Sequence, residues 1–145
     1  MPIKFSQFIQ GGRVDTSDII VGLDPNGQNA QFTPSTVLPY TSIATASYPL
    51  SVNNGYTIDY DAGTVTLTLP SLSAYGSVIE LLSTVNHTFS VSVTGSQAIN
   101  FGNKFTSTNG FVSTGSGYTF IRMICTQQNT SWAITNCEPG YLIIN

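Results

Sequence analysis

Hydrophobic and polar residues alternate with a period of two along most of the chain beyond residue 40. In residues 64–69 valine and leucine alternate with threonine, and in residues 89–94 apolar residues alternate with serine and threonine. Residues 56–61 repeat the pattern with tyrosine and isoleucine as the apolar members. Because successive side chains of a β-strand point to opposite faces, this pattern predicts strands with one buried face.

Turn residues separate these runs at short and regular intervals. Asn54-Gly55 and Asn109-Gly110 are typical of tight turns between strands. Many short strands with turns at such spacing are the pattern of two-layer or barrel-shaped β proteins. We therefore predict an all-β fold, a β-sandwich or small barrel-like antiparallel domain, over residues 41–145.

The inward-facing positions of the predicted strands define a candidate core. Residues 77–82 are apolar on both faces except at Glu80, so this segment is predicted to be a central strand. The candidate core residues all lie on the apolar side of their strands and are Val65, Leu67, Leu69, Ile79, Leu81, Phe89, Val91, Ile121, Met123 and Trp132.

The last two predicted strands flank a turn at residues 127–130 and contain both cysteines of the chain. Pairing them as a simple hairpin places Cys125 opposite Trp132 and Cys137 opposite Phe120. The two thiols are then about 16 Å apart at about 3.3 Å per residue. Since the Cα atoms of a disulfide lie within about 7 Å, we expect no disulfide between them, and we expect Cys125 to be a core residue.

Residues 1–40 differ in composition from the rest and are predicted to form an N-terminal arm. An apolar run at residues 19–23, the turn pair Asn26-Gly27 and a return near residues 30–33 predict a short β-hairpin. Further apolar residues have the spacing of one helical turn, which is too short to be stable alone and needs a surface to dock on. The candidate residues for attachment and assembly are Phe5, Phe8, Ile9, Ile19, Ile20 and Phe32.

The chain is unusually poor in charge. Charged residues make up 8% of its 145 residues, against about 25% in an average protein. Four lysines and arginines are too few to neutralise many phosphates, which argues against a nucleic-acid partner. No apolar run is long enough to span a membrane, and the N-terminal residues lack the apolar core of a signal peptide, so we expect synthesis in a cytosol.

The polar faces of the predicted strands carry serine and threonine rather than lysine and glutamate. Soluble monomers usually keep their sheets apart with charged side chains. Neutral faces rich in hydroxyl groups suit packing against copies of the same chain, which favours a homo-oligomer. The alternative is a monomer with a neutral surface.

The candidate chemistry in the sequence is sparse. His87 is the only histidine and lies between two predicted strands, and no serine nucleophile motif accompanies it. Asp59 and Asp61 would share a strand face about 6.6 Å apart, a weak signal for glycoside hydrolysis and half of a calcium loop. We predict no catalytic, cofactor-binding or metal-binding residue, and hence no enzyme. The seven tyrosines suit a sugar-binding surface or an oligomer interface.

Several segments spread over nearly the whole chain carry a resemblance to a known family. They are Ile3-Lys-Phe-Ser-Gln-Phe8, Thr16-Ser-Asp-Ile-Ile-Val-Gly-Leu23, Asn29-Ala-Gln-Phe32, Thr66-Leu-Thr-Leu-Pro70, Ala74-Tyr-Gly-Ser-Val-Ile-Glu-Leu81, Ile99-Asn-Phe-Gly102, Ile124-Cys-Thr126, Asn129-Thr-Ser-Trp132 and Leu142-Ile-Ile-Asn145. Together they resemble bacteriophage and prophage virion structural proteins, of the tail-fibre-like or capsid-decoration-like kind. These proteins usually have Gly-Gly-Trp in the hairpin after residue 82, where this chain has Val85-Asn-His-Thr88.

The resemblance implies a non-enzymatic β-rich component of the virion surface, commonly a homotrimer, assembled in the cytoplasm of the bacterial host. Its expected role is capsid decoration (as a cement protein) or a place in a tail fibre, with the major capsid or tail proteins as partners. Residues 41–145 would be the trimerising domain, and deleting residues 1–34 should leave that domain folded but unable to attach.

Two other functions stay open at this point. The chain could instead be a receptor-binding module that recognises a glycan on the host surface, for which the sequence assigns no contact residue. The third and weakest hypothesis is a glycan hydrolase that uses Asp59 and Asp61.

Overall fold

The structure of the protein is a computed structural model that describes residues 20–23, 29–32, 38–115, 117–138 and 142–145. Within these residues, β-strands are the only regular secondary structure. Within these ranges no helix is long and apolar enough to cross a membrane. Contacts between Cα atoms divide the chain into two units, Met1–Val37 and Leu38–Asn145.

The first unit contains a β-hairpin. Strand β1 (Ile20–Leu23) pairs antiparallel with β2 (Asn29–Phe32). The hairpin predicted from the apolar run and the Asn-Gly turn pair is therefore confirmed.

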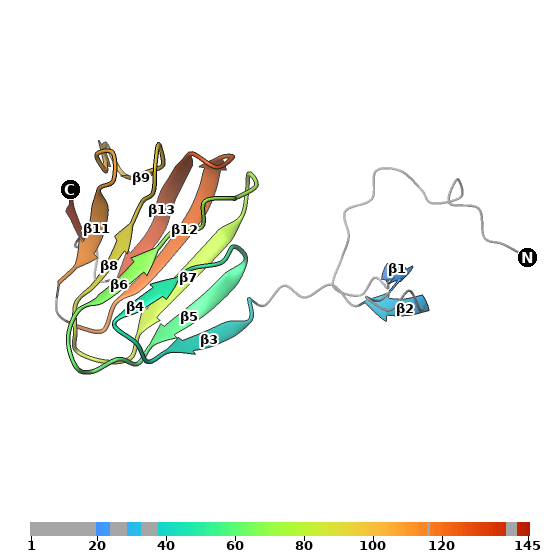
Figure 1. Ribbon diagram of the computed structural model, residues 1–145, viewed down its shortest axis with the longest axis horizontal. Coiled ribbons are helices and arrows are strands. Elements are labelled where there is room, and N and C mark those ends of the chain that lie inside the picture. The colour runs from blue at the N-terminus through green and yellow to red at the C-terminus, as the bar shows by residue number, and fades with distance from the viewer. Residues whose placement is uncertain (1–19, 24–28, 33–37, 116, 139–141) are drawn as a thin grey trace, which may run out of the picture. The chain divides into compact units, whose positions relative to one another are not determined.

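The second unit is a β-sandwich of two mixed sheets that pack face to face (Figure 1). The seven-stranded sheet has the order β10-β9-β13-β12-β7-β5-β3, and the five-stranded sheet has the order β14-β11-β8-β6-β4. The strands are β3 (Tyr40–Ile43), β4 (Ser47–Pro49), β5 (Asn54–Ile58), β6 (Val65–Thr68), β7 (Val78–Ser83), β8 (Phe89–Ser92), β9 (Ala98–Phe101), β10 (Lys104–Phe105), β11 (Phe111–Thr114), β12 (Phe120–Gln127), β13 (Ser131–Glu138) and β14 (Leu142–Ile144).

The predicted sandwich is confirmed, but the prediction that its sheets are antiparallel was wrong. From β3 to β8 each successive strand lies in the opposite sheet, so that β3, β5 and β7 are neighbours in one sheet and β4, β6 and β8 in the other. These neighbours pair in parallel. Each connection crosses the sandwich instead of closing a hairpin, and two such crossings return the chain in its original direction.

The core lies between the inner faces of the two sheets. All ten residues predicted for the core are at most 2% exposed. Glu80 lies on the outer side of β7, which is an interior strand of the seven-stranded sheet between β12 and β5, in line with the predicted central strand. The indole nitrogen of Trp132 is buried and has no hydrogen-bond partner among the described residues.

The hairpin of β12 and β13 contains two irregularities in register. Cys125 faces Trp132 as predicted, but Cys137 faces Ile121 and not Phe120. An extra residue in one strand of an antiparallel pair shifts every later pair by one position, which explains the difference. Both cysteines are buried, and about 13 Å of strand separates Cys125 from the residue opposite Cys137, which is beyond the reach of a disulfide.

Candidate functional site

The residues predicted for attachment are only partly described. Ile20 and Phe32 are direct partners across the hairpin of β1 and β2, so the structure brings these two positions together. The other four, Phe5, Phe8, Ile9 and Ile19, lie outside the described residues.

The outer side of the seven-stranded sheet is rich in apolar side chains, and we call it the apolar face. Leu82 of β7 faces Phe120 of β12, and Val78 faces Ile124 four residues away along each strand. Leu82 is 37% exposed, and Phe105 at the sheet edge is 70% exposed. The face is defined by Tyr40, Val78, Leu82, Phe105, Phe120, Ile124 and Ala133.

Polar side chains also lie on this side of the sheet, where Thr57 faces Leu82 and Asn100 faces Ala133, and one row of them carries charge. The Tyr40 hydroxyl donates a hydrogen bond of 2.6 Å to a carboxylate oxygen of Glu80, and Arg122 Nε lies 3.4 Å from the other oxygen. The acid and the base neutralise each other, so the row adds no net charge to the face. Partial burial, together with the hydrogen bond to Glu80 and its negative charge, raises the pKa of Tyr40 to about 12.

Gly55 makes this row geometrically feasible. It lies between Tyr40 and Glu80 in the register of three parallel strands. A methyl group added at Gly55 would be 2.5 Å from the ring of Tyr40. The absence of a side chain at this position therefore lets the tyrosine ring lie across β5 and reach the carboxylate on β7.

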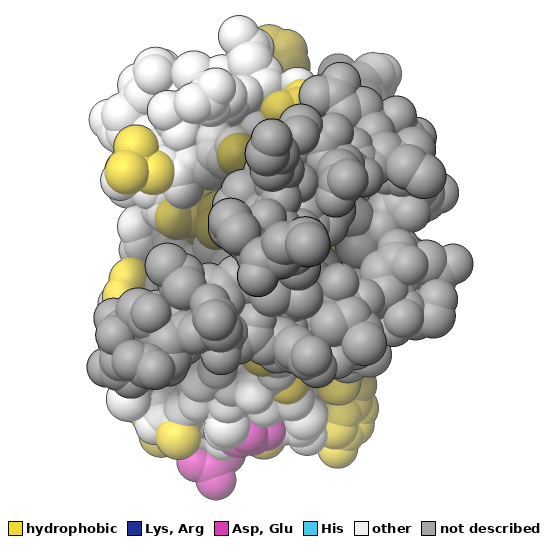
Figure 2. Space-filling view, turned by 90° about the vertical axis from the view of Figure 1, so that its right-hand side faces the viewer, with side chains coloured by type: hydrophobic (Ala, Val, Ile, Leu, Met, Phe, Trp, Pro, Cys, Tyr) yellow, Lys and Arg dark blue, Asp and Glu magenta, His cyan; other side chains and the backbone are white. Residues whose placement is uncertain are grey.

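The outer side of the five-stranded sheet carries hydroxyl groups, and we call it the hydroxyl face. Thr66 of β6 faces Ser90 of β8, and Thr68 faces Ser92. The register continues the first row to Ser47 on β4 and Ser113 on β11, and these six hydroxyl residues define the face. On the same side of the sheet, Phe111 faces Ser92 and Ile143 faces Ser113, and both are exposed hydrophobic residues. None of the six is charged. Figure 2 views the molecule from the right-hand side of Figure 1, where β3, β5 and β7 lie, and does not show this face. Apart from acidic atoms near one end, the side chains that are not grey in that view are hydrophobic or uncharged polar.

The residues considered for catalysis are not assembled into a site. Asp59 follows the last residue of β5, so the prediction that Asp59 and Asp61 share a strand face was wrong. The Asp59 carboxylate accepts hydrogen bonds from the hydroxyl groups of Ser42, Thr84 and Thr57. These bonds, led by that from Ser42, lower the pKa of Asp59.

The remaining polar candidates are scattered over the sandwich. His87 is half-buried in the connection between β7 and β8, where the sequence placed it. Cys125 is buried with its sulfur 3.3 Å from the Ser73 hydroxyl oxygen. Among the described residues no group of three or more His, Cys, Asp or Glu side chains is placed to hold a metal ion.

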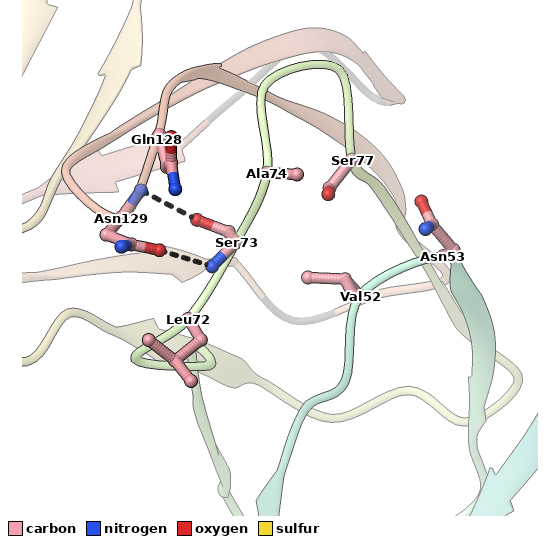
Figure 3. Close-up of a pocket in the computed structure, with 8 residues that line it drawn as sticks. All are labelled: Val52, Asn53, Leu72, Ser73, Ala74, Ser77, Gln128 and Asn129. Atoms are coloured by element: carbon pink, nitrogen blue, oxygen red, sulfur yellow. Dashed lines mark hydrogen bonds between the residues drawn. The ribbon is translucent and has the colours of Figure 1, made fainter.

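Three loops meet at one end of the sandwich and border an open hollow of about 380 Å³ (Figure 3). They are the connection of β4 to β5, the connection of β6 to β7 and the turn between β12 and β13. The hollow is lined by Val52, Asn53, Leu72, Ser73, Ala74, Ser77, Gln128 and Asn129. Sequence analysis did not find it because its wall comes from three distant segments, although asparagines at two of the turns were a signal.

Two asparagines hold these loops together. Asn53 and Asn129 both have φ of 58°, a left-handed conformation that asparagine tolerates better than most residues. The side-chain oxygen of Asn129 accepts the backbone N–H of Ser73 at 2.7 Å, and that of Asn53 accepts the N–H of Val78 at 3.1 Å. The walls of the hollow are therefore fixed by hydrogen bonds within the protein.

No family model matches this sequence, and no curated protein matches it.

Proposed function

We propose that this chain is a non-enzymatic structural protein of a bacteriophage virion, exposed on the particle surface and built from several copies. The observation that carries the proposal is the apolar face, an outer sheet surface on which hydrophobic side chains lie to either side of a self-neutralised ion pair. The resemblance of the sequence to virion structural proteins supports the particle as the setting.

A second copy of this chain is the occupant that the apolar face fits best. Seven strands at about 4.8 Å spacing make the sheet about 29 Å wide, which is enough for an interface of standard size. Glu80 and Arg122 already neutralise each other, so a neutral neighbour leaves no charge unpaired. The low charge of the whole chain removes the repulsion that keeps most soluble proteins apart.

The number of copies decides how the apolar face is used. If the face packs on the same face of a second copy, the contact closes as a dimer. In a homotrimer, which the resemblance implies, the face instead packs on a different surface of the neighbour and the contact repeats three times. The N-terminal arm, whose hairpin pairs Ile20 with Phe32, is then available to contact the major capsid or tail proteins.

Electron microscopy of purified particles tests the proposed setting. Particles from the bacterium that encodes this chain would be labelled with an antibody fragment raised against residues 38–145. We expect label on intact particles: over the head for a capsid-decoration protein, and on the tail for a tail-fibre component. Label that stays in the soluble lysate and never accompanies purified particles would contradict the proposal.

Deletion of the arm supplies the matched control for that experiment. Particles made with the chain lacking residues 1–37 should carry no label, while the shortened protein stays folded in the lysate. Particles that carry the shortened protein as densely as the full chain would overturn the assignment of attachment to the arm.

A further inference from the structure

The wall of the loop hollow contains a serine whose hydroxyl group bonds to no other described residue. Ser77 is only 5% exposed. Its backbone N–H and carbonyl groups bond to Ala74 and Cys125, but its side-chain oxygen makes no hydrogen bond within the part of the chain that the structure describes. Figure 3 shows this side chain pointing toward the hollow, on the side opposite Gln128. Among the described residues only the indole nitrogen of Trp132 is a buried side-chain polar atom without a partner, so the Ser77 oxygen is open to the hollow and can bond to a ligand there.

The other polar groups of the hollow are amides with donors to spare. The oxygen of the Asn129 side chain is fixed on the backbone of Ser73, which leaves its amide nitrogen to donate elsewhere. Asn53 is fixed in the same way on Val78. Gln128, exposed at the rim, adds both a donor and an acceptor.

Apolar groups complete the lining. Val52, Leu72 and Ala74 line the same space, and Leu72 is 75% exposed because no described residue covers it. Tyr75, the next residue along the loop from Ala74, is 80% exposed. Among the described residues, no carboxylate, lysine, arginine or histidine lines the hollow.

We propose that the loop hollow binds one unit of a neutral saccharide. A sugar ring has hydroxyl groups around its rim and C–H groups on its faces, and the hollow offers amides and a hydroxyl for the first and aliphatic side chains for the second. Its volume of about 380 Å³ lies within the range of about 300–1,000 Å³ that is usual for small-ligand sites. Charged sugars are disfavoured because no lining residue can pair with their charge.

The site is prepared in advance of binding. The backbone N–H of Asn129 bonds to Ser73 and the backbone N–H of Asn53 bonds to Val78, in addition to the two side-chain bonds. The loop from β6 is also tied to β12, because the N–H of Gly76 donates to the carbonyl oxygen of Cys125 at 2.8 Å. Binding therefore orders little of the protein, which favours affinity for a small ligand.

Saturation-transfer difference NMR on the full chain tests the proposal. The probes are glucose, galactose, mannose and N-acetylglucosamine, with glucuronate as an acidic sugar and a short serine-glycine peptide as a neutral compound that is not a sugar. We expect saturation of at least one neutral sugar. Silence from all neutral sugars, or saturation of only glucuronate or the peptide, would overturn the proposal.

Variants then assign the signal to the hollow. Ser77→Ala removes no hydrogen bond within the protein, so it should fold normally and bind the responding sugar about fivefold to tenfold more weakly. Ser90→Ala on the hydroxyl face is the matched control and should bind as wild type. Ala74→Arg, at an exposed position, should abolish the signal by placing a charge in the hollow.

Wild-type binding by either Ser77→Ala or Ala74→Arg would place the sugar elsewhere and overturn the assignment. The outcome is separate from the proposed role in a virion, because none of these residues belongs to the apolar face.

Discussion

On the outer side of the seven-stranded sheet, Leu82 and Phe120 are partners across two strands, whereas on the outer side of the five-stranded sheet Thr66 and Ser90 are. Both pairs alternate with buried residues, so the period-two pattern is the same in the two sheets. The difference lies in what the outward positions contain. The central strands of one face offer apolar surface that water solvates poorly, and those of the other offer hydroxyl groups that water solvates well. Phe111 and Ile143 add exposed apolar groups to the second face only on β11 and β14.

The contrast shows that a surface without net charge can either stay soluble or favour association, depending on its side chains. A hydroxyl face stays soluble without lysine or glutamate, while an apolar face without charge favours association. The sequence suggested that the serine and threonine faces would pack against other copies. The structure favours the opposite assignment as our proposal, in which the apolar face forms the contact and the hydroxyl face remains in water.

The largest expected effect on stability comes from a core substitution, because both faces belong to sheets that pack on the same core. Phe89 is 1% exposed between the sheets, and Phe89→Ala should lower the free energy of unfolding by about 3–5 kcal/mol. Ser90→Ala, the next residue and outward-facing, should change it by less than about 0.5 kcal/mol. Denaturant unfolding of the two variants measures both, and equal losses would show that the inner and outer sides of β8 are not as described.

A smaller effect is specific to the apolar face. Gly55→Ala should destabilise the protein by about 1–2 kcal/mol, because the new methyl group displaces the Tyr40 ring and breaks its bond to Glu80. In the Tyr40→Ala background the same change should become neutral or stabilising, because alanine restricts the unfolded chain more than glycine does. A double-mutant cycle by denaturant unfolding gives the coupling, and an unchanged cost in both backgrounds would refute the proposed ring position.

The smallest effect is one of pH. The pKa of Tyr40 is raised from its ordinary value of 10.0 to about 12, so folding favours its protonated form. The resulting stabilisation is complete below pH 10 and is lost as the pH rises from 10 to about 12. Absorbance titration of tyrosinate should show one late-titrating group that disappears in Tyr40→Phe. The same late group in that variant would assign the raised pKa to another tyrosine.

The sequence was sufficient to predict the strands and the core, because both depend on local alternation. Residues such as Leu67 and Val91 face inward wherever their strands lie in the sheet. The pairing of these strands was not predictable in the same way. Leu67 and Val91 become partners only because the chain crosses to β7 in the opposite sheet and then crosses back. Alternation predicts on which side of its sheet a side chain lies, but it does not predict which strand is its neighbour.

Candidate sites were predicted less well for a related reason. The loop hollow joins Asn53, Ser77 and Asn129, which are separated by tens of residues and meet only when the loops of both sheets gather at one end. Asp59 had the spacing of a catalytic carboxylate with Asp61, but two of its three hydroxyl partners, Ser42 and Thr84, come from separate segments that the sequence could not bring together.

The most direct test of the apolar face as the contact between copies is the mass of the full chain in solution. Sedimentation of the wild type should give a dimer or trimer at micromolar concentration. Leu82→Lys with Ile124→Lys should weaken association at least about a hundredfold, which is about 2.7 kcal/mol. Thr66→Lys with Ser90→Lys adds the same charge to the hydroxyl face and should leave the mass unchanged. A monomeric wild type, or an oligomer lost only in the hydroxyl-face variant, would contradict the account.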